Sequence, residues 1–177
     1  EVDLAPVNTQ GFVDVSALET LIRPDTTLVS VMAVNNEIGA IQPIQEISQL
    51  LADKPTISFH VDAVQAIGKV PTEQYLTDRV DFASFSGHKF HSVRGVGFVY
   101  IKAGKKIAPL LTGGGQESDK RSTTENVAGI AATAKALRLT LDKDKATDSQ
   151  KQLAAMKQIL VDELSKYQDV TVFSGME

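Results

Sequence analysis

The sequence predicts an α/β fold with a mostly parallel sheet, and two observations support this. Short apolar runs typical of strands, at residues 28–34, 57–61 and 80–85, alternate along the chain with segments of helical periodicity. In addition, the strand, helix and strand that follow one another within residues 28–61 imply a parallel, right-handed crossover. Sheets of this kind are normally packed against helices.

The first predicted helix precedes this crossover. Ser16 and Glu19 have the spacing of a capping box, and we expect the helix to end near Ile22, before Pro24. Residues 28–34 then form a continuous apolar run, which is typical of a strand that is covered on both faces.

The helix of the crossover is predicted to begin at Pro43, because proline is favoured at the first helical position. Its apolar side chains fall on one face and are Ile44, Ile47, Leu50 and Leu51. Residues 57–61 form the next predicted strand.

Two further strands flank a short turn in the middle of the chain. The strands are predicted at residues 80–85 and 97–101, and the turn contains Ser86-Gly-His-Lys89. A Gly-rich polar loop follows from Thr112 to Thr124. We expect Thr124 to cap a helix that runs to about Leu141.

The charged stretch of residues 142–148 predicts a domain boundary. We therefore assign residues 1–143 to one domain and residues 144–177 to the beginning of a second, smaller one. Within the second, residues 150–166 have the pattern of an amphipathic helix and residues 170–173 that of a strand.

Composition limits the possible classes of function. The 177 residues suit one domain, or one domain and part of another, and 42% hydrophobic residues support a core. The net charge of −4 provides no basic footprint for nucleic acid. No apolar run is long enough to span a membrane, so we expect a cytoplasmic protein. The chain has no cysteine, which excludes disulfides and thiolate metal sites within it.

Lys89 and Asp62 are the residues that point most directly to chemistry. A lysine in a turn between two buried strands is held at a fixed point, and a partly desolvated lysine can lose its proton and attack a carbonyl. Asp62 ends the predicted strand before it, in Phe59-His-Val-Asp-Ala-Val-Gln65. A carboxylate that faces a pyridinium nitrogen is the usual protein partner of pyridoxal 5'-phosphate (PLP).

Four segments together carry a resemblance to a known family. They are Val29-Ser-Val-Met-Ala-Val-Asn-Asn-Glu-Ile-Gly39, His60-Val-Asp-Ala-Val-Gln65, Ser84-Phe-Ser-Gly-His-Lys-Phe90, and Gly113-Gly-Gly-Gln-Glu117 with Arg121-Ser-Thr-Thr-Glu-Asn126. In their order and spacing the chain resembles the cysteine desulfurases of the class V aminotransferase superfamily, which are fold-type I PLP enzymes. The resemblance implies a three-layer α/β/α large domain with a mostly parallel sheet, followed by the start of a smaller α+β C-terminal domain.

The resemblance also implies roles for individual residues. Lys89 would form the Schiff base with PLP, and Asp62 would bind the pyridinium N–H. Contacts to the phenolate oxygen would come from Gln65 and Asn36, and contacts to the phosphate from Ser86 and His88. Thr124 would reach the PLP phosphate of a neighbouring subunit in a homodimer.

Ordinary alternatives exist for each of these residues taken alone. Lys89 and Gln65 could be surface side chains, and Asp62 could only cap the following turn. A metal pair of His88 and His91 is disfavoured because no third ligand is evident. The chain also departs from the family at Ser92-Val93-Arg94, where a Gly-Pro-Lys type of turn is usual, and at Thr123, where glycine is usual.

The activity implied by the resemblance is the removal of sulfur from L-cysteine, which yields L-alanine and an enzyme persulfide. The sulfur would pass to iron–sulfur cluster assembly or tRNA thiolation through acceptor or scaffold proteins. We expect no direct contact with nucleic acid or membrane.

A catalytic cysteine is required for this reaction and is not in the chain. We therefore expect the chain to be the central part of a longer enzyme and to be inactive alone. A selenocysteine lyase or another class V enzyme is the nearest alternative, and a non-catalytic piece that binds no cofactor is another. A nucleotide-binding domain is disfavoured, because neither G-x-G-x-x-G nor a P-loop is present.

Overall fold

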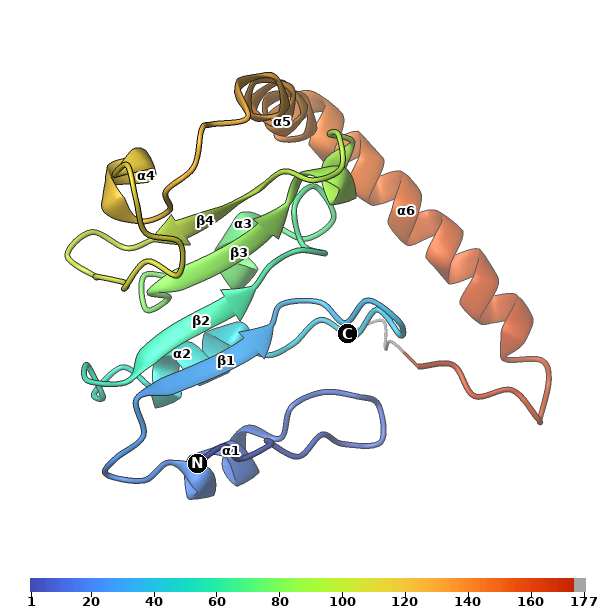
Figure 1. Cartoon of the computed structure of the whole chain (residues 1–177). Coiled ribbons are helices and arrows are strands. Elements are labelled where there is room, and N and C mark those ends of the chain that lie inside the picture. The colour runs from blue at the N-terminus through green and yellow to red at the C-terminus, as the bar shows by residue number, and fades with distance from the viewer. Residues whose placement is uncertain (174–177) are drawn as a thin grey trace.

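The computed structural model describes residues 1–173, apart from the side chains of residues 143–147. Figure 1 shows a sheet with helices against it and one long helix that extends to the side. In chain order the elements are α1 (Val15–Leu21), β1 (Leu28–Met32), α2 (Ile44–Leu50), β2 (Ser58–Asp62), α3 (Thr72–Tyr75), β3 (Phe82–Ser86), the 3₁₀ helix η1 (Gly87–Phe90), β4 (Gly97–Ile101), α4 (Gln116–Asp119), α5 (Val127–Thr140) and α6 (Lys143–Leu164).

The sheet has the strand order β1-β2-β3-β4. The first three strands are parallel, and β4 is antiparallel to β3. In the register of the parallel strands Met32 lies opposite Asp62, and Asp62 lies opposite Ser84. The carboxyl ends of β1, β2 and β3 therefore meet at one edge, and the predicted mostly parallel α/β fold is confirmed.

The core lies between one face of the sheet and the helices α2 and α3, which are behind the sheet in Figure 1. The strands contribute Val29, Val31, Phe59, Val61, Ala83 and Phe85, and the helical side contributes Ile44, Ile47, Leu51 and Tyr75. Full burial of a side chain such as Phe or Val contributes about 1.5–3 kcal/mol relative to exposure. Phe59 and Val61, both with no exposed area, place β2 at the centre of this core.

The opposite face of the sheet is partly open, which corrects the expectation that β1 is covered on both faces. Exposed and buried residues alternate along β1, and Leu28 and Met32 are exposed. Ser30 lies on the same face as these two residues. The sequence did not reveal this alternation, because two of the exposed positions of β1 are occupied by the apolar residues Leu28 and Met32.

A buried carboxylate and two partly exposed cations join the beginnings of β2 and β3. Asp81 is 2% exposed and accepts hydrogen bonds from the backbone N–H of Phe59 (3.0 Å) and from Nη1 of Arg79 (2.8 Å). Nζ of Lys105 lies 3.1 Å from the same carboxylate. Arg79 also donates to the carbonyl oxygens of Leu51 and Ile57. Buried charges are tolerated when they are paired in this way.

Three predicted helix starts are displaced. The cap of α1 is Asp14, whose carboxylate accepts from the N–H of Ala17, and not Ser16. Pro43 is the residue before α2 rather than its first residue. Asn126, and not Thr124, caps α5 by accepting from the N–H of Gly129. The errors at α1 and α5 arose because neighbouring polar residues offered competing caps, whereas the displacement at Pro43 is of a single residue.

The helix predicted at residues 150–166 starts earlier than expected, because α6 begins at Lys143 and this segment contains no Gly or Pro to interrupt a helix. The prediction of a strand at residues 170–173 is wrong. In the described part of the chain, residues 170–173 form no strand. The α6 side chains Leu153, Met156 and Leu160 are exposed. The division of the chain at residues 143 and 144 stays a prediction.

Candidate functional site

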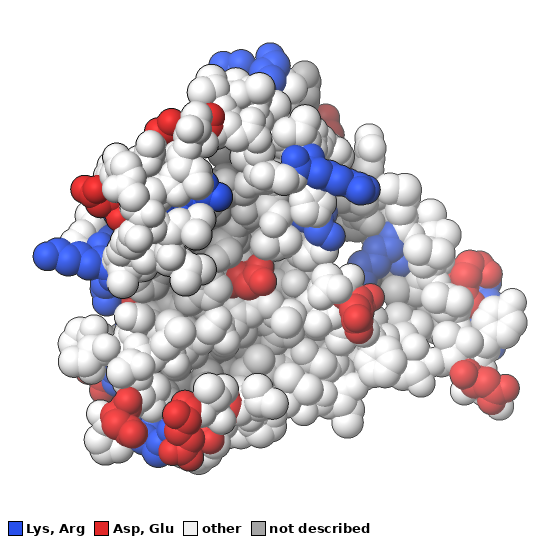
Figure 2. Space-filling view, in the orientation of Figure 1, with Lys and Arg blue, Asp and Glu red and all other residues white. Residues whose placement is uncertain are grey.

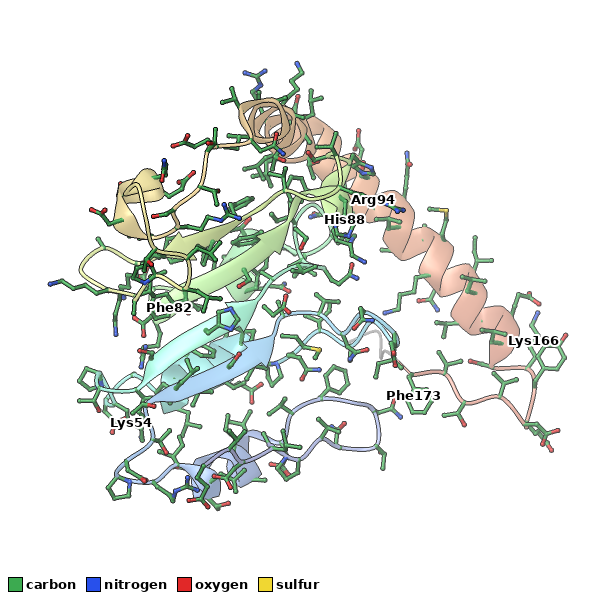
Figure 3. All side chains as sticks on the ribbon, in the orientation of Figure 1. Lys54, Phe82, His88, Arg94, Lys166 and Phe173 are labelled. Atoms are coloured by element: carbon green, nitrogen blue, oxygen red, sulfur yellow. The ribbon has the colours of Figure 1, made fainter. Side chains whose placement is uncertain are left out.

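The sheet edge where β1, β2 and β3 end brings six predicted site residues to one region. Asn36 follows β1, and Asp62 and Gln65 lie at and just beyond the end of β2. Ser86 is the last residue of β3, and His88 and Lys89 belong to η1 directly after it. Figure 3 shows His88 beyond one end of β3 and Phe82 at the other. In parallel α/β sheets ligands bind outside the carboxyl ends of the strands.

The turn that carries Lys89 is built from η1 and the residues around it. Phe90 is buried and anchors the turn, whereas Lys89 is partly exposed. The N–H of Gly87 donates to the carbonyl of Val96 (2.9 Å), which ties the turn to the start of β4. A Cβ atom on Gly87 would lie 3.0 Å from that carbonyl oxygen, so glycine permits this close approach.

Asp62 is exposed at the end of β2, and its orientation is defined by the following turn. One carboxylate oxygen accepts from the N–H of Val64 (3.0 Å). The N–H of Ala63 donates to the carbonyl of Ser84 (3.0 Å), which fixes the exit of β2 against β3. Ala63 and Ala66 are fully buried and anchor this turn in the core. The capping role considered for Asp62 is therefore present, and it leaves the carboxylate at the surface of the edge.

His60 was missed by the sequence reasoning, although it lies two residues before Asp62 on the same face of β2. Its Nδ1 lies 2.7 Å from Oγ of Ser30, and its Nε2 lies 2.8 Å from Oγ of Ser84. Burial lowers the pKa of His60, and the negative charge of Asp62 only partly offsets this. A neutral imidazole thus links β1, β2 and β3 beneath the edge.

Lys69 is a second residue that the sequence reasoning missed. Its Nζ donates to Oε1 of Gln65 (3.0 Å), four residues earlier. Burial lowers the pKa of Lys69, and the positive charge of Lys89 lowers it further. Two amines, one carboxamide and one carboxylate therefore lie in the same neighbourhood. The spacing of four residues was the available signal.

Asn35 holds the loop after β1 through side-chain hydrogen bonds. Its Oδ1 accepts from the backbone N–H groups of Glu37 and Ile38, at 2.9 and 3.0 Å. This hydrogen bonding holds the loop and leaves Asn36 exposed beside the edge.

Thr124 lies apart from the other predicted residues in sequence, in the loop before α5. It lines a pocket of about 520 Å³ together with Gly95, Gly97 and Arg121. The guanidinium of Arg121 is hydrogen-bonded to the hydroxyl of Thr123. Because Gly97 lies opposite Ser86 in the sheet, this pocket is near the same edge.

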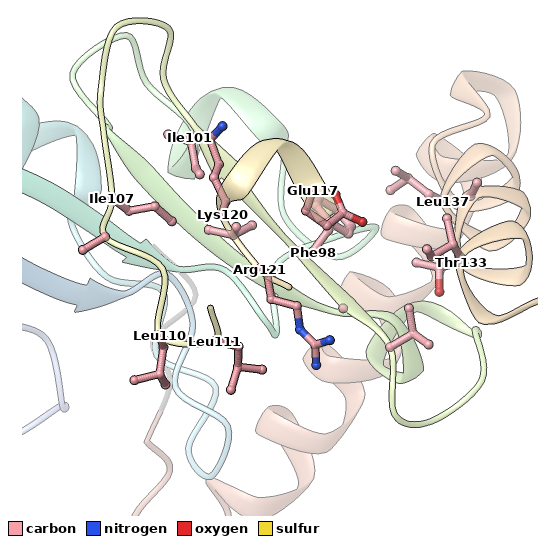
Figure 4. A pocket seen from close by; sticks show the side chains of 16 residues that line it. Phe98, Ile101, Ile107, Leu110, Leu111, Glu117, Lys120, Arg121, Thr133 and Leu137 are labelled. Atoms are coloured by element: carbon pink, nitrogen blue, oxygen red, sulfur yellow. The ribbon is translucent and has the colours of Figure 1, made fainter. Parts of the chain in front are cut away.

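A larger apolar cavity of about 890 Å³ lies between β4, the loop of residues 107–111 and α5. Figure 4 shows Phe98, Leu111 and Leu137 around it, with Arg121 at its polar side. Figure 2 shows that the face over the sheet is hollowed and that most charged side chains lie around its rim.

The donor set at the edge fits PLP. A primary amine (Lys89) suits its aldehyde, a carboxylate (Asp62) suits its ring nitrogen, and a hydroxyl and an imidazole (Ser86 and His88) suit its phosphate.

In the part of the chain that the structure describes, no group of three His, Asp or Glu side chains could hold a metal ion. Among the same residues no helix is long and apolar enough to cross a membrane.

Comparison with known proteins identifies the family. The aminotransferase class-V family matches residues 1–176. The chain belongs to this family. It is 57% identical over 140 residues to a "NifS/IcsS protein homolog" of Lactobacillus delbrueckii subsp. bulgaricus. The aligned residues make up 79% of this chain and 36% of the relative. It is also 49% identical over 148 residues to the cysteine desulfurase IscS of Dictyoglomus turgidum. This alignment includes 82% of the chain and 36% of the relative.

Solved structures of class-V relatives have the same fold. A NifS-like protein superposes with a TM-score of 0.85 at 42% identity, over 94% of this chain and 45% of that one. A NifS-like protein from Rickettsia africae gives a TM-score of 0.81 at 32% identity, over 97% of this chain and 48% of that one. The chain thus spans about one third to one half of the length of these relatives. The resemblance to cysteine desulfurases is confirmed.

Proposed function

We propose that this chain is the cofactor-binding central part of a PLP-dependent cysteine desulfurase. The observation that carries the proposal is the sheet edge at which Lys89, Asp62, Ser86 and His88 converge, in a chain whose relatives are named cysteine desulfurases. The full-length protein would convert L-cysteine to L-alanine and leave the sulfur as an enzyme persulfide. Iron–sulfur cluster assembly or tRNA thiolation would receive that sulfur.

PLP, when bound, supplies an electron sink for the substrate Cα. Asp62 holds the ring proton, because its carboxylate favours the charged form of a nearby nitrogen. Ser86 and His88 would donate hydrogen bonds to the phosphate, and Gln65 and Asn36 would donate to the phenolate oxygen. Together these residues would orient the group at the sheet edge.

Lys89 would hold the cofactor through Nζ, and the same amine would serve to move protons at the substrate. Its position supports both tasks, since η1 holds it at the end of β3 and Phe90 fixes the turn in the core. Lys69 contributes a second positive charge near the same amine. It also shares Gln65, so the orientation of the Gln65 carboxamide depends on it.

The thiolate that takes sulfur from the substrate must come from outside this chain, since the chain has no cysteine. The solved structure of a relative, SspA, is a complex with cysteine, and it has a TM-score of 0.69 at 32% identity. This likeness supports L-cysteine as the substrate. A homodimer, a cytoplasmic location and a sulfur-acceptor partner belong to the same proposal.

The test uses the full-length protein with L-cysteine and PLP, and it measures alanine, sulfide and the visible absorbance of bound PLP. We expect alanine formation and a visible band in the wild type, and the loss of both in Lys89→Ala. The exposed Lys106 supplies the matched control, since Lys106→Ala should retain both. Wild-type protein that binds PLP but forms no alanine from L-cysteine would contradict the proposed activity.

A further inference from the structure

The segment after the Lys89 turn, residues 91–94, lacks the proline that would restrain its backbone. A Gly-Pro-Lys type of turn would be stiff, because proline fixes φ. This chain has Ser92-Val93-Arg94 instead. His91, the residue before them, has a φ of 71°, in the left-handed region that costs a non-glycine residue about 1 kcal/mol or more. Such a conformation persists only where its surroundings hold it.

Ser92 is fastened at two points. Its N–H donates to the carbonyl of Gly87 (3.0 Å), which closes the loop of residues 87–92 around Lys89. Its hydroxyl lies 2.9 Å from Oγ1 of Thr133 on α5, so that one of the two hydroxyls donates to the other. Thr133 is only 6% exposed. Loss of either hydroxyl would therefore leave its partner without this bond in a water-poor contact.

The face of α5 that carries Thr133 is packed closely against the same turn. A Cβ atom on Gly87 would lie 3.0 Å from Oγ1 of Thr133, and one on Gly129 would lie 2.4 Å from Cγ2 of Val96. These helix positions are four residues apart and share one face. The helix thus backs the turn where η1 meets β4, and the Ser92–Thr133 bond is the polar link within that contact.

We infer that Ser92 and Thr133 form a positioning pair that holds the turn carrying Lys89. The link supplies, through side chains, the restraint that a glycine–proline turn would supply through its backbone. The effect on Lys89 chemistry rests on the function proposed above. The restraint itself is a property of the apo fold and can be measured without cofactor.

The first experiment measures amide hydrogen exchange in the full-length protein without PLP. Ser92→Ala and Thr133→Val should each speed exchange at the Gly87 and Ser92 amides by about fivefold, the effect of losing one hydrogen bond. Since both variants remove the same bond, the double variant should exchange no faster than the single ones. Thr133→Ser keeps the hydroxyl and should stay near the wild type.

Thr20→Val is the matched control, because the Thr20 hydroxyl bonds within its own helix α1 (to the carbonyl of Ala17, 2.7 Å). This variant should leave exchange at Gly87 and Ser92 unchanged. Unchanged exchange in both Ser92→Ala and Thr133→Val would overturn the pair, as would fully additive effects in the double variant.

A second measurement separates positioning from plain packing. In the PLP-loaded protein, the pH midpoint of the visible band should move upward in Ser92→Ala and Thr133→Val, because a looser Lys89 turn lets water stabilise the protonated linkage. Thr20→Val and Thr133→Ser should leave the midpoint in place. Faster exchange with an unmoved midpoint would refute the positioning role. Absence of any band in the wild type would instead refute the proposed function and leave the exchange result standing.

Discussion

Asp81 provides the sharpest test of what holds the β2 and β3 strands in register. We predict that Asp81→Asn destabilises the fold strongly, because it leaves Arg79 and Lys105 beside a neutral side chain. Their side chains are 15% and 30% exposed, against 2% for Asp81. Removing one partner of a buried ion pair costs about 3–5 kcal/mol.

The lower end of that range applies to Asp81→Asn. The amide oxygen of Asn can still accept from the Phe59 N–H, and both cations are close enough to the surface to regain some water. A loss of about 3 kcal/mol is then expected, against a total stability of about 5–15 kcal/mol for an ordinary domain. Urea unfolding followed by circular dichroism at pH 7 measures the difference in the free energy of unfolding.

The pH dependence gives an independent check. Burial alone would raise the pKa of Asp81, but the hydrogen bonds from Phe59, Lys105 and Arg79 outweigh it and the pKa is lowered. The carboxylate contribution is therefore fully present above the unfolded value of about 3.9 and is lost as the pH falls through the folded pKa. The deficit of Asp81→Asn should shrink below about pH 4.

Asp53 is the matched control, because it pairs with Lys54 at 2.8 Å but is 82% exposed. Exposed pairs of this kind contribute little, so Asp53→Asn should unfold like the wild type. A midpoint for Asp81→Asn that equals that of Asp53→Asn would refute the reasoning.

Three further predictions concern the proposed function. Asp62→Asn in the full-length enzyme should keep the circular dichroism spectrum and lower the rate of alanine formation by orders of magnitude, because a neutral partner no longer holds the ring proton; near-normal turnover would rule out this role. The 177-residue chain should form no alanine from L-cysteine with added PLP, since it has no thiol; turnover by the chain alone would contradict this. Full-length protein should sediment as a homodimer, and Thr124→Ala should speed PLP release, because under the proposed function Thr124 would complete the phosphate site of the neighbouring subunit; a monomer that holds PLP tightly would be inconsistent with it.

The strands β2, β3 and β4 were predicted best, because their apolar runs are the clearest local patterns in the sequence. β4 was predicted with its observed bounds, whereas β2 and β3 were each displaced by one or two residues at both ends. The apolar runs of β2 and β3 lie against α2 and α3 in the core, so pattern and packing agree there. At the site, the sequence placed Asp62 at the end of one strand and Lys89 in the turn after the next, and the parallel register brings these two strand ends together.

What could not be predicted depends on contacts between residues distant in sequence. The hydrogen-bond partners of the His60 imidazole are Ser30 and Ser84, on two other strands, and no local sequence pattern predicts these contacts. The same holds for Ser92 and Thr133, which are 41 residues apart. Two helix caps were misassigned for a different reason: Asp14 lies two residues before Ser16, and Asn126 two residues after Thr124, so each start offered more than one cap-forming side chain.

The most direct test of the account is the identity of the lysine that binds PLP. Borohydride reduction of the full-length protein with PLP, followed by peptide mass mapping, should place the pyridoxyl group on Lys89. Lys69 is the other lysine that could carry the group, because its pKa is lowered and it lies near Lys89. A modified Lys89 with an unmodified Lys69 is the predicted result, and a pyridoxyl group on Lys69, or its retention in Lys89→Ala, would contradict the account.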